Sequence, residues 1–210
     1  MSYVDAPPIY GLILAGGHSS RMGRDKALLA YHGKSQIEWT AERARLICQR
    51  VFLSVRPDQA SDAGRSGLPQ IVDRLADKGP IAGIMAAQAL APDVAWLALA
   101  CDLPFIDEQT LRYLYAARDP ERVATAYRST HDGLPEPLCA IFEPRSRELI
   151  EAYVASGKNC PRKFLSSSDA LLVGQPHPGA LDNINTPEEF QAASATIAVP
   201  TPPPTGRGSG

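Results

Sequence analysis

Short apolar runs alternate along the chain with segments whose apolar residues recur at helical spacing. Buried strands are predicted at 9–14, 51–55, 71–72, 96–100, 123–127, 138–142 and 171–173, and helices at 36–50, 81–90, 107–117 and 144–155. Thr186, Pro187 and Glu189 form a typical helix start, and this last helix would run to about Ala195. Such alternation favours an α/β fold of three layers, α/β/α, with a mostly parallel, Rossmann-like sheet.

The end of the chain has a different composition. From residue 197 onward Pro, Thr, Gly and Ser prevail, with three consecutive prolines at 202–204. Such a segment has too few apolar side chains to offset the entropy of ordering. We therefore expect one domain over residues 1–196 and a disordered tail over residues 197–210.

The overall composition narrows the function classes. The formal net charge of -2 gives no basic surplus for nucleic acid, and no apolar run is long enough to cross a membrane. No basic and apolar leader precedes Tyr10, so a cytoplasmic location is expected. The four cysteines are widely scattered and form no Cys-x-x-Cys pair, which argues against a zinc or redox site: Cys48, Cys101, Cys139 and Cys160.

The most informative segment follows the first predicted strand, from Leu14 to Lys26. Gly16 and Gly17 lack a Cβ, so their backbone N–H groups can approach phosphate oxygens closely. Arg21 and Lys26 could neutralise much of a triphosphate. The segment has neither Gly-Lys-Ser/Thr nor Gly-x-Gly-x-x-Gly, so it is neither a Walker loop nor a dinucleotide fingerprint.

Oxygen ligands also fall at predicted strand ends. Asp73 and Asp102 each follow a strand, and ligands of parallel α/β sheets bind at this edge. Asp102 could hold Mg²⁺ or cap a turn, and Asn185, just before the last predicted helix, has the same two possibilities. The histidines show no ligand spacing and are expected at the surface: His18, His32, His131 and His177.

These residues together resemble a known family. The run from Leu14 to Lys26 is similar to the signature of molybdenum cofactor guanylyltransferases, which are nucleotidyltransferases with a glycosyltransferase-A-like fold. Four later landmarks come in the family's order: Asp73 with 79–83, then 101–105, then 137–140, and finally 183–189. The resemblance spans about residues 9 to 193.

The resemblance implies a reaction in which GTP and molybdopterin give the guanine dinucleotide cofactor and pyrophosphate. It assigns the nucleotide site to Leu14, Ala15, Gly16, Gly17, Arg21, Lys26, Asp73 and Asp102, and the Mg²⁺ site to Asp102 and Asn185. Arg21, Lys26 and Asp102 would be catalytic, and Arg162 would face the pterin. Where some relatives have Asn after the second strand, this chain has Arg56.

Several alternatives remain open. A molybdopterin cytidylyltransferase would use CTP, but such relatives tend toward Ala-Ala-Gly where this chain has Gly16-Gly17. A sugar-phosphate nucleotidyltransferase shares the fold, and a non-catalytic nucleotide-binding module would release no pyrophosphate. GTP and molybdopterin are the expected ligands, and molybdoenzymes or other proteins of cofactor biosynthesis are possible partners.

Overall fold

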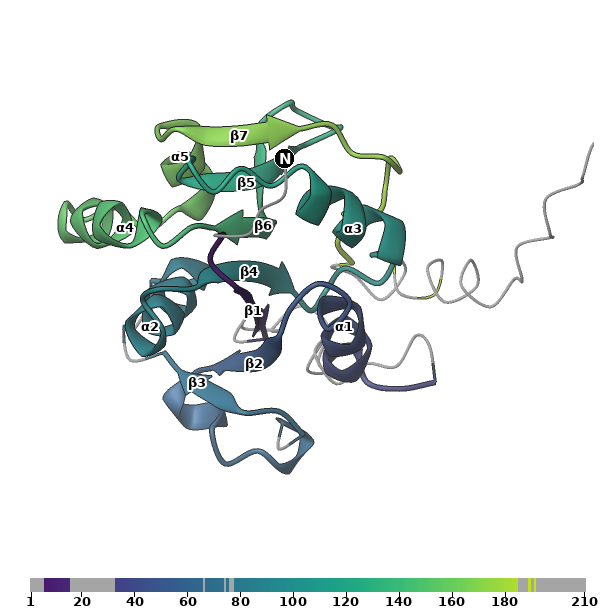
Figure 1. Ribbon diagram of the computed structural model, residues 1–210. Helices are drawn as coiled ribbons and strands as arrows, with labels where there is room; N and C mark the ends of the chain where they lie inside the picture. Colours follow the sequence, from purple (N-terminus) through teal and green to yellow (C-terminus); the bar gives the residue numbers. More distant parts are fainter. Residues whose placement is uncertain are drawn as a thin grey trace, which may run out of the picture.

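A twisted sheet forms the centre of the molecule (Figure 1). The computed structural model describes residues 6–15, 33–65, 67–73, 75, 78–184, 189 and 191. Within them the sheet has seven strands in the order β3-β2-β1-β4-β6-β5-β7. The strands are β1 (Ile9–Leu14), β2 (Arg50–Val55), β3 (Gln70–Val72), β4 (Ala95–Ala100), β5 (Ala124–Arg128), β6 (Pro135–Phe142) and β7 (Ala170–Val173). Only β6 runs antiparallel to its neighbours, so the expected mostly parallel sheet is confirmed.

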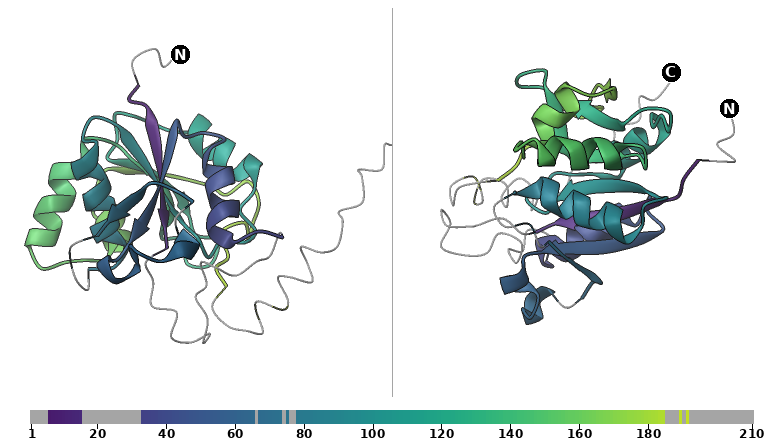
Figure 2. Two further views of the ribbon diagram at one scale, coloured as in Figure 1. Left: turned by 90° about the horizontal axis from the view of Figure 1, so that it is seen from below. Right: turned by 90° about the vertical axis from the view of Figure 1, so that its left-hand side faces the viewer.

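Helices cover both faces of this sheet, as Figure 2 shows, which confirms the three layers. The helices α1 (Gln36–Ala44) and α3 (Glu108–Ala116) pack on one face, and α2 (Pro80–Leu90), α4 (Ser146–Ala155) and α5 (Pro161–Ser166) pack on the other. Two short 3-10 helices, η2 (Pro57–Gln59) and η3 (Ala63–Arg65), connect β2 to β3. In the described part of the chain no helix is long and apolar enough to span a membrane.

The central strand β4 shows why a continuous apolar run in the sequence predicted a buried strand. All six of its residues are buried, because both faces of the sheet are covered there. Leu97 and Leu99 belong to the core under α1 and α3, whereas Trp96 and Ala98 belong to the core under α2 and α4. A continuous apolar run is therefore what a buried parallel strand requires.

The structure corrects several predicted boundaries. The first helix ends at Ala44 and not at residue 50, because the following residues turn and Arg50 already pairs in β2. The strand β6 begins at Pro135, three residues before its predicted start, and α5 was not predicted at all. The helix predicted from Pro187 and the tail 197–210 lie essentially outside the described residues.

Candidate nucleotide and metal site

The candidate site lies where neighbouring parallel strands end. In the sheet register, Leu14 of β1 stands beside Ala100 of β4, and Val55 of β2 stands beside Val72 of β3. Backbone hydrogen bonds continue past these ends. The Cys101 N–H donates to the Leu14 carbonyl over 3.3 Å, and the Asp73 N–H donates to the Val55 carbonyl over 2.9 Å. The predicted residues Leu14, Ala15, Asp73 and Asp102 therefore share the carboxyl-terminal edge of the sheet.

Asp102 is placed by the buried strand β4 and by a second, distant segment. The N–H of Ile184 donates to the Asp102 carbonyl over 3.2 Å. This bond brings the residue that directly precedes Asn185 to the end of β4, although Asn185 itself lies outside the described residues. Asp102 does not cap the next helix: Asp107 does so, accepting from Thr110 N–H over 2.7 Å. Two segments predicted to supply metal ligands thus meet at one point.

Asp73 occupies the end of β3 and is half-buried. Its Oδ1 accepts the N–H of Leu75 over 2.8 Å. Burial raises the pKa of Asp73 above its ordinary value, although this hydrogen bond acts in the opposite direction. A ribose or base donor could bind the carboxylate oxygens of Asp73, and this role stays a prediction.

The helix α2 begins at the same edge of the sheet. Gly79 precedes it with φ 64° and ψ −151°, a conformation open essentially to glycine alone, and Pro80 fills the first helical position. Farther along, a Cβ on Gly83 would lie 2.5 Å from Ser54 Oγ, so only glycine lets α2 approach β2 this closely. The positive end of the α2 helix dipole therefore lies at the carboxyl-terminal edge of the sheet.

Part of the predicted site lies outside the described residues. This holds for Gly16, Gly17, Arg21 and Lys26 of the glycine-rich segment and for Asn185. Their roles stay predictions. The structure does place the two attachment points of the segment, because Ala15 is buried beside the end of β4 and Ser35 begins α1.

Arg162 lies at the carboxyl-terminal edge as well. Its Nη1 is 2.9 Å from Asp132 Oδ2 and its Nη2 is 3.0 Å from Glu136 Oε2. Because β6 is antiparallel, its first residues, including Glu136, lie where β4 and β5 end. Arg162 is the second residue of α5. Its role toward the pterin stays a prediction, and two carboxylates now compete for its charge.

Arg56, the departure from the family pattern, follows β2. Its guanidinium binds the adjacent Asp58 through two hydrogen bonds, Nε to Oδ1 over 3.0 Å and Nη2 to Oδ2 over 2.9 Å. This pairing satisfies part of the guanidinium locally.

Sequence reasoning missed two histidine–carboxylate pairs near this edge. His131 and His177 are at the surface, as expected, but each binds an aspartate: His131 Nε2 lies 2.9 Å from Asp182 Oδ1, and His177 Nδ1 lies 2.6 Å from Asp107 Oδ2. The partners are 51 and 70 residues apart in the chain. No local spacing signals such pairs, so only the fold could reveal them.

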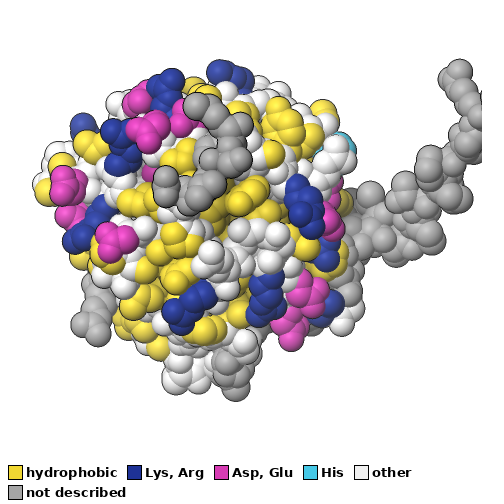
Figure 3. Space-filling model, viewed as in Figure 1, with side chains coloured by type: hydrophobic (Ala, Val, Ile, Leu, Met, Phe, Trp, Pro, Cys, Tyr) yellow, Lys and Arg dark blue, Asp and Glu magenta, His cyan; other side chains and the backbone are white. Residues whose placement is uncertain are grey.

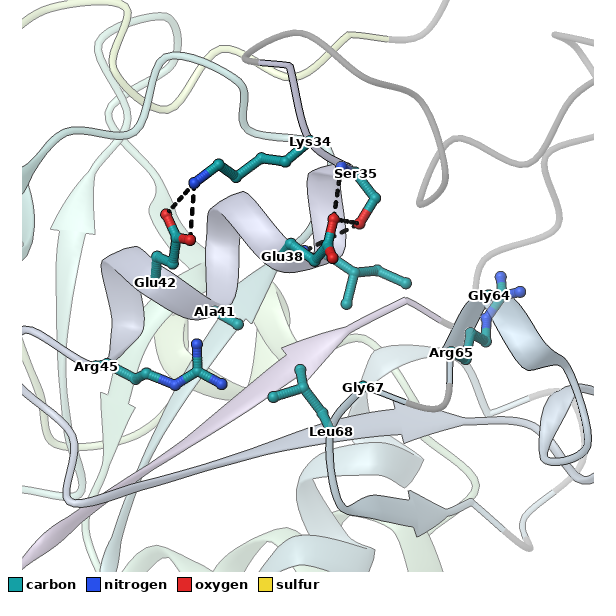
Figure 4. A pocket seen from close by; sticks show the side chains of 11 residues that line it. Lys34, Ser35, Glu38, Ala41, Glu42, Arg45, Gly64, Arg65, Gly67 and Leu68 are labelled. Atoms are coloured by element: carbon teal, nitrogen blue, oxygen red, sulfur yellow. Dashed lines mark hydrogen bonds and ion pairs between the residues drawn. The ribbon is translucent and has the colours of Figure 1, made fainter.

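A hollow of about 670 Å³ lies on the flank of α1 (Figure 4). It runs between this helix and residues 64, 65, 67 and 68, and Arg45 points into it. One ion pair lies beside the hollow, where Lys34 Nζ is 2.8 Å from both oxygens of Glu42. None of the described residues predicted for the nucleotide site lines this hollow.

Among the described residues, no group of three or more His, Cys, Asp or Glu side chains could hold a metal ion. Mg²⁺ needs only one or two protein oxygens, because water and phosphate complete its shell. On the face in Figure 3, Lys and Arg side chains stand beside Asp and Glu rather than forming one basic surface.

A mostly parallel sheet between two helical layers, with acidic side chains after its strands and a helix N-terminus at the same edge, is typical of nucleotide-binding α/β proteins. A family model described as "MobA-like NTP transferase domain" matches residues 11–171. The chain therefore belongs to the MobA-like NTP transferase family, and it is a nucleotidyltransferase.

Relatives in sequence agree with this assignment. The chain is 37% identical over 187 residues to a "Molybdenum cofactor biosynthesis bifunctional protein" of Synechocystis, matching 89% of this chain but only 54% of that protein. It is 30% identical over 193 residues to a "Molybdenum cofactor guanylyltransferase" of Cereibacter sphaeroides, covering 90% of this chain and 97% of that one. The chain thus spans about half of the first relative and nearly all of the second.

Solved structures show the same fold. The crystal structure of molybdopterin-guanine dinucleotide biosynthesis protein A from Archaeoglobus fulgidus has a TM-score of 0.73 to this chain at 22% identity, covering 90% of this chain and 98% of that one. This likeness confirms the expected nucleotidyltransferase fold.

Proposed function

We propose that this chain transfers GMP from GTP to molybdopterin, forming the guanine dinucleotide cofactor and releasing pyrophosphate. The observation that carries the proposal is the hydrogen bond between Ile184 and Asp102, which joins two distant motifs of the family at the end of β4. The guanylyl and pterin specificity is supported by the C. sphaeroides guanylyltransferase, which this chain matches over nearly its whole length.

The proposed roles follow from charge. Asp102 and Asn185 offer the carboxylate and amide oxygens that suit Mg²⁺, which when bound neutralises phosphate charge. Arg21 and Lys26 are proposed to stabilise the departing pyrophosphate, and the backbone of Gly16 and Gly17 to hold the triphosphate.

The chemistry needs no strong general base. The attacking group, a phosphate monoester, is already anionic near neutral pH, so positioning and charge neutralisation account for most of the rate. Two of the three buried cysteines, Cys48 and Cys139, fit this view, because burial raises the pKa of the Cys48 thiol to about 12 and also raises the pKa of Cys139. Neither thiol is a nucleophile at neutral pH.

A turnover panel tests the proposal. The full chain is mixed with molybdopterin, Mg²⁺ and each of the four nucleoside triphosphates in turn, and pyrophosphate release is measured. We expect release with GTP well above release with CTP. Equal use of the two triphosphates would contradict the guanylyl assignment, and no release with any of them would indicate a binding module.

A further inference from the structure

The segment between β7 and Asn185 has to be held in place by isolated contacts. Residues 174–184 form turns and bends without helix or strand. They nevertheless cross the carboxyl-terminal edge and end at Ile184, which is 7% exposed and hydrogen-bonded to Asp102. Whatever fixes this segment therefore also fixes the hydrogen bond between Ile184 and Asp102.

Apolar contacts hold one side of the segment. Ala180 and Ile184 are buried, and Leu181 packs against the core under α1 and α3. Such contacts favour burial but are non-directional, so they leave the segment free to slide along the edge. Directional contacts are needed to set its register.

The two histidine–aspartate pairs supply directional contacts to separate elements. His177 reaches Asp107, the N-cap of α3, whose other carboxylate oxygen is already held by Thr110 N–H. Asp182 reaches His131, in the turn between β5 and β6. The segment is thus tied to α3 at one end and to the β5–β6 turn at the other, five residues apart.

We propose that His177 with Asp107, and His131 with Asp182, are positioning pairs that hold residues 177–184 in register and so hold Ile184 against Asp102. The consequence for turnover rests on the proposed function. The positioning itself does not, because it is a property of the protein alone.

The pair at His131 also predicts a pH dependence. The hydrogen bond and the charge of Asp182 raise the pKa of His131 above 6.5, and the nearby Glu136 and Asp132 act in the same direction. Arg162 faces the same two carboxylates and partly offsets them. A raised pKa means that the charged pair is complete below about pH 6.5 and is lost as the pH rises through the pKa of the folded protein.

Amide hydrogen exchange of the full chain, without ligands, tests the positioning. In the double variant His131→Ala/His177→Ala we expect the Ile184 amide to exchange about threefold to tenfold faster, the scale of two exposed ion pairs. Amides of β4 should keep their rates. The variant His131→Gln/His177→Asn keeps a donor at each position and should restore most of the protection. Arg147→Ala breaks an exposed pair with Glu151 elsewhere and serves as the matched control.

Protection of the Ile184 amide, corrected for intrinsic exchange, should also fall between pH 6 and 8 in the unmodified chain but not in His131→Gln. Unchanged Ile184 exchange in the double alanine variant, or equal acceleration across the sheet, would overturn the proposal. Where the unmodified chain transfers GMP, the double variant should need about threefold to tenfold more Mg²⁺ for half-maximal turnover. An unmodified chain that transfers no nucleotide would overturn the proposed function and leave the exchange result standing.

Discussion

At the amino-terminal edge of the sheet the main charged pair is buried, whereas at the carboxyl-terminal edge the charged groups lie at or near the surface. Glu143, with no exposed side-chain surface, receives two bonds from Arg118, over 2.6 and 2.7 Å. Arg118 also donates to the Pro7 carbonyl over 2.9 Å, which ties the start of the chain to the end of β6. At the opposite edge, Asp73, Asp102 and Arg162 remain accessible to solvent.

This contrast leads us to expect that the charged groups of the amino-terminal edge contribute to stability and those of the carboxyl-terminal edge to function. The buried groups at the amino-terminal edge are satisfied by other protein groups, and this favours a single rigid arrangement. The groups at the carboxyl-terminal edge are partly exposed, at the edge where parallel α/β sheets bind ligands. Substitutions at the amino-terminal edge should therefore change the free energy of unfolding, and substitutions at the carboxyl-terminal edge should change GMP transfer.

The largest effect is expected from Arg118→Ala. The substitution leaves Glu143 buried without its partner, so unfolding free energy should fall by about 3–5 kcal/mol, measured by urea denaturation. The double variant Arg118→Met/Glu143→Leu removes both charges and should cost less than the single change. A single variant as stable as the unmodified chain would show that the pair contributes nothing to the fold.

Asp102→Asn should affect activity instead. The change keeps the size of the side chain and removes the charge proposed to hold Mg²⁺. We expect GMP transfer to fall by at least ~100-fold, on the order of 3 kcal/mol of transition-state stabilisation, with little change in the urea midpoint. Near-normal turnover at low Mg²⁺ would contradict a metal-binding role for Asp102.

The same contrast explains how far the sequence could be interpreted. The buried strand β4 and its neighbours were predictable, because residues covered on both faces must be apolar in a continuous run. Asp73 and Asp102 were predictable because they directly follow such strands. The register that brings Ile184 to Asp102, and Glu136 to Arg162, depends on tertiary contacts across dozens of residues. Local patterns carry no signal for those contacts.

A smaller effect is expected from Arg162→Ala. If Arg162 faces the pterin phosphate, molybdopterin binding should weaken by roughly 1–3 kcal/mol while GTP binding barely changes. Asp132→Asn is a control with the opposite expected result. It removes a carboxylate that competes for Arg162, so molybdopterin binding should become stronger. Titrating each ligand separately into both variants decides the matter, and an equal loss for GTP and molybdopterin would remove Arg162 from the acceptor site.

The smallest effect is expected from Arg56→Ala. Arg56 follows β2, at the position where it departs from the family resemblance, and its guanidinium is bound at two atoms by Asp58. An exposed pair of this kind contributes little to stability, and an arginine already held by a carboxylate presents less charge to a phosphate. We therefore expect KM for GTP to change by less than about twofold and the urea midpoint to stay constant. Asp58→Ala is the matched control, because it releases Arg56 without removing it. A tenfold rise in KM for GTP with Arg56→Ala, together with a fall with Asp58→Ala, would instead place Arg56 on the nucleotide and extend the site along the carboxyl-terminal edge to β2.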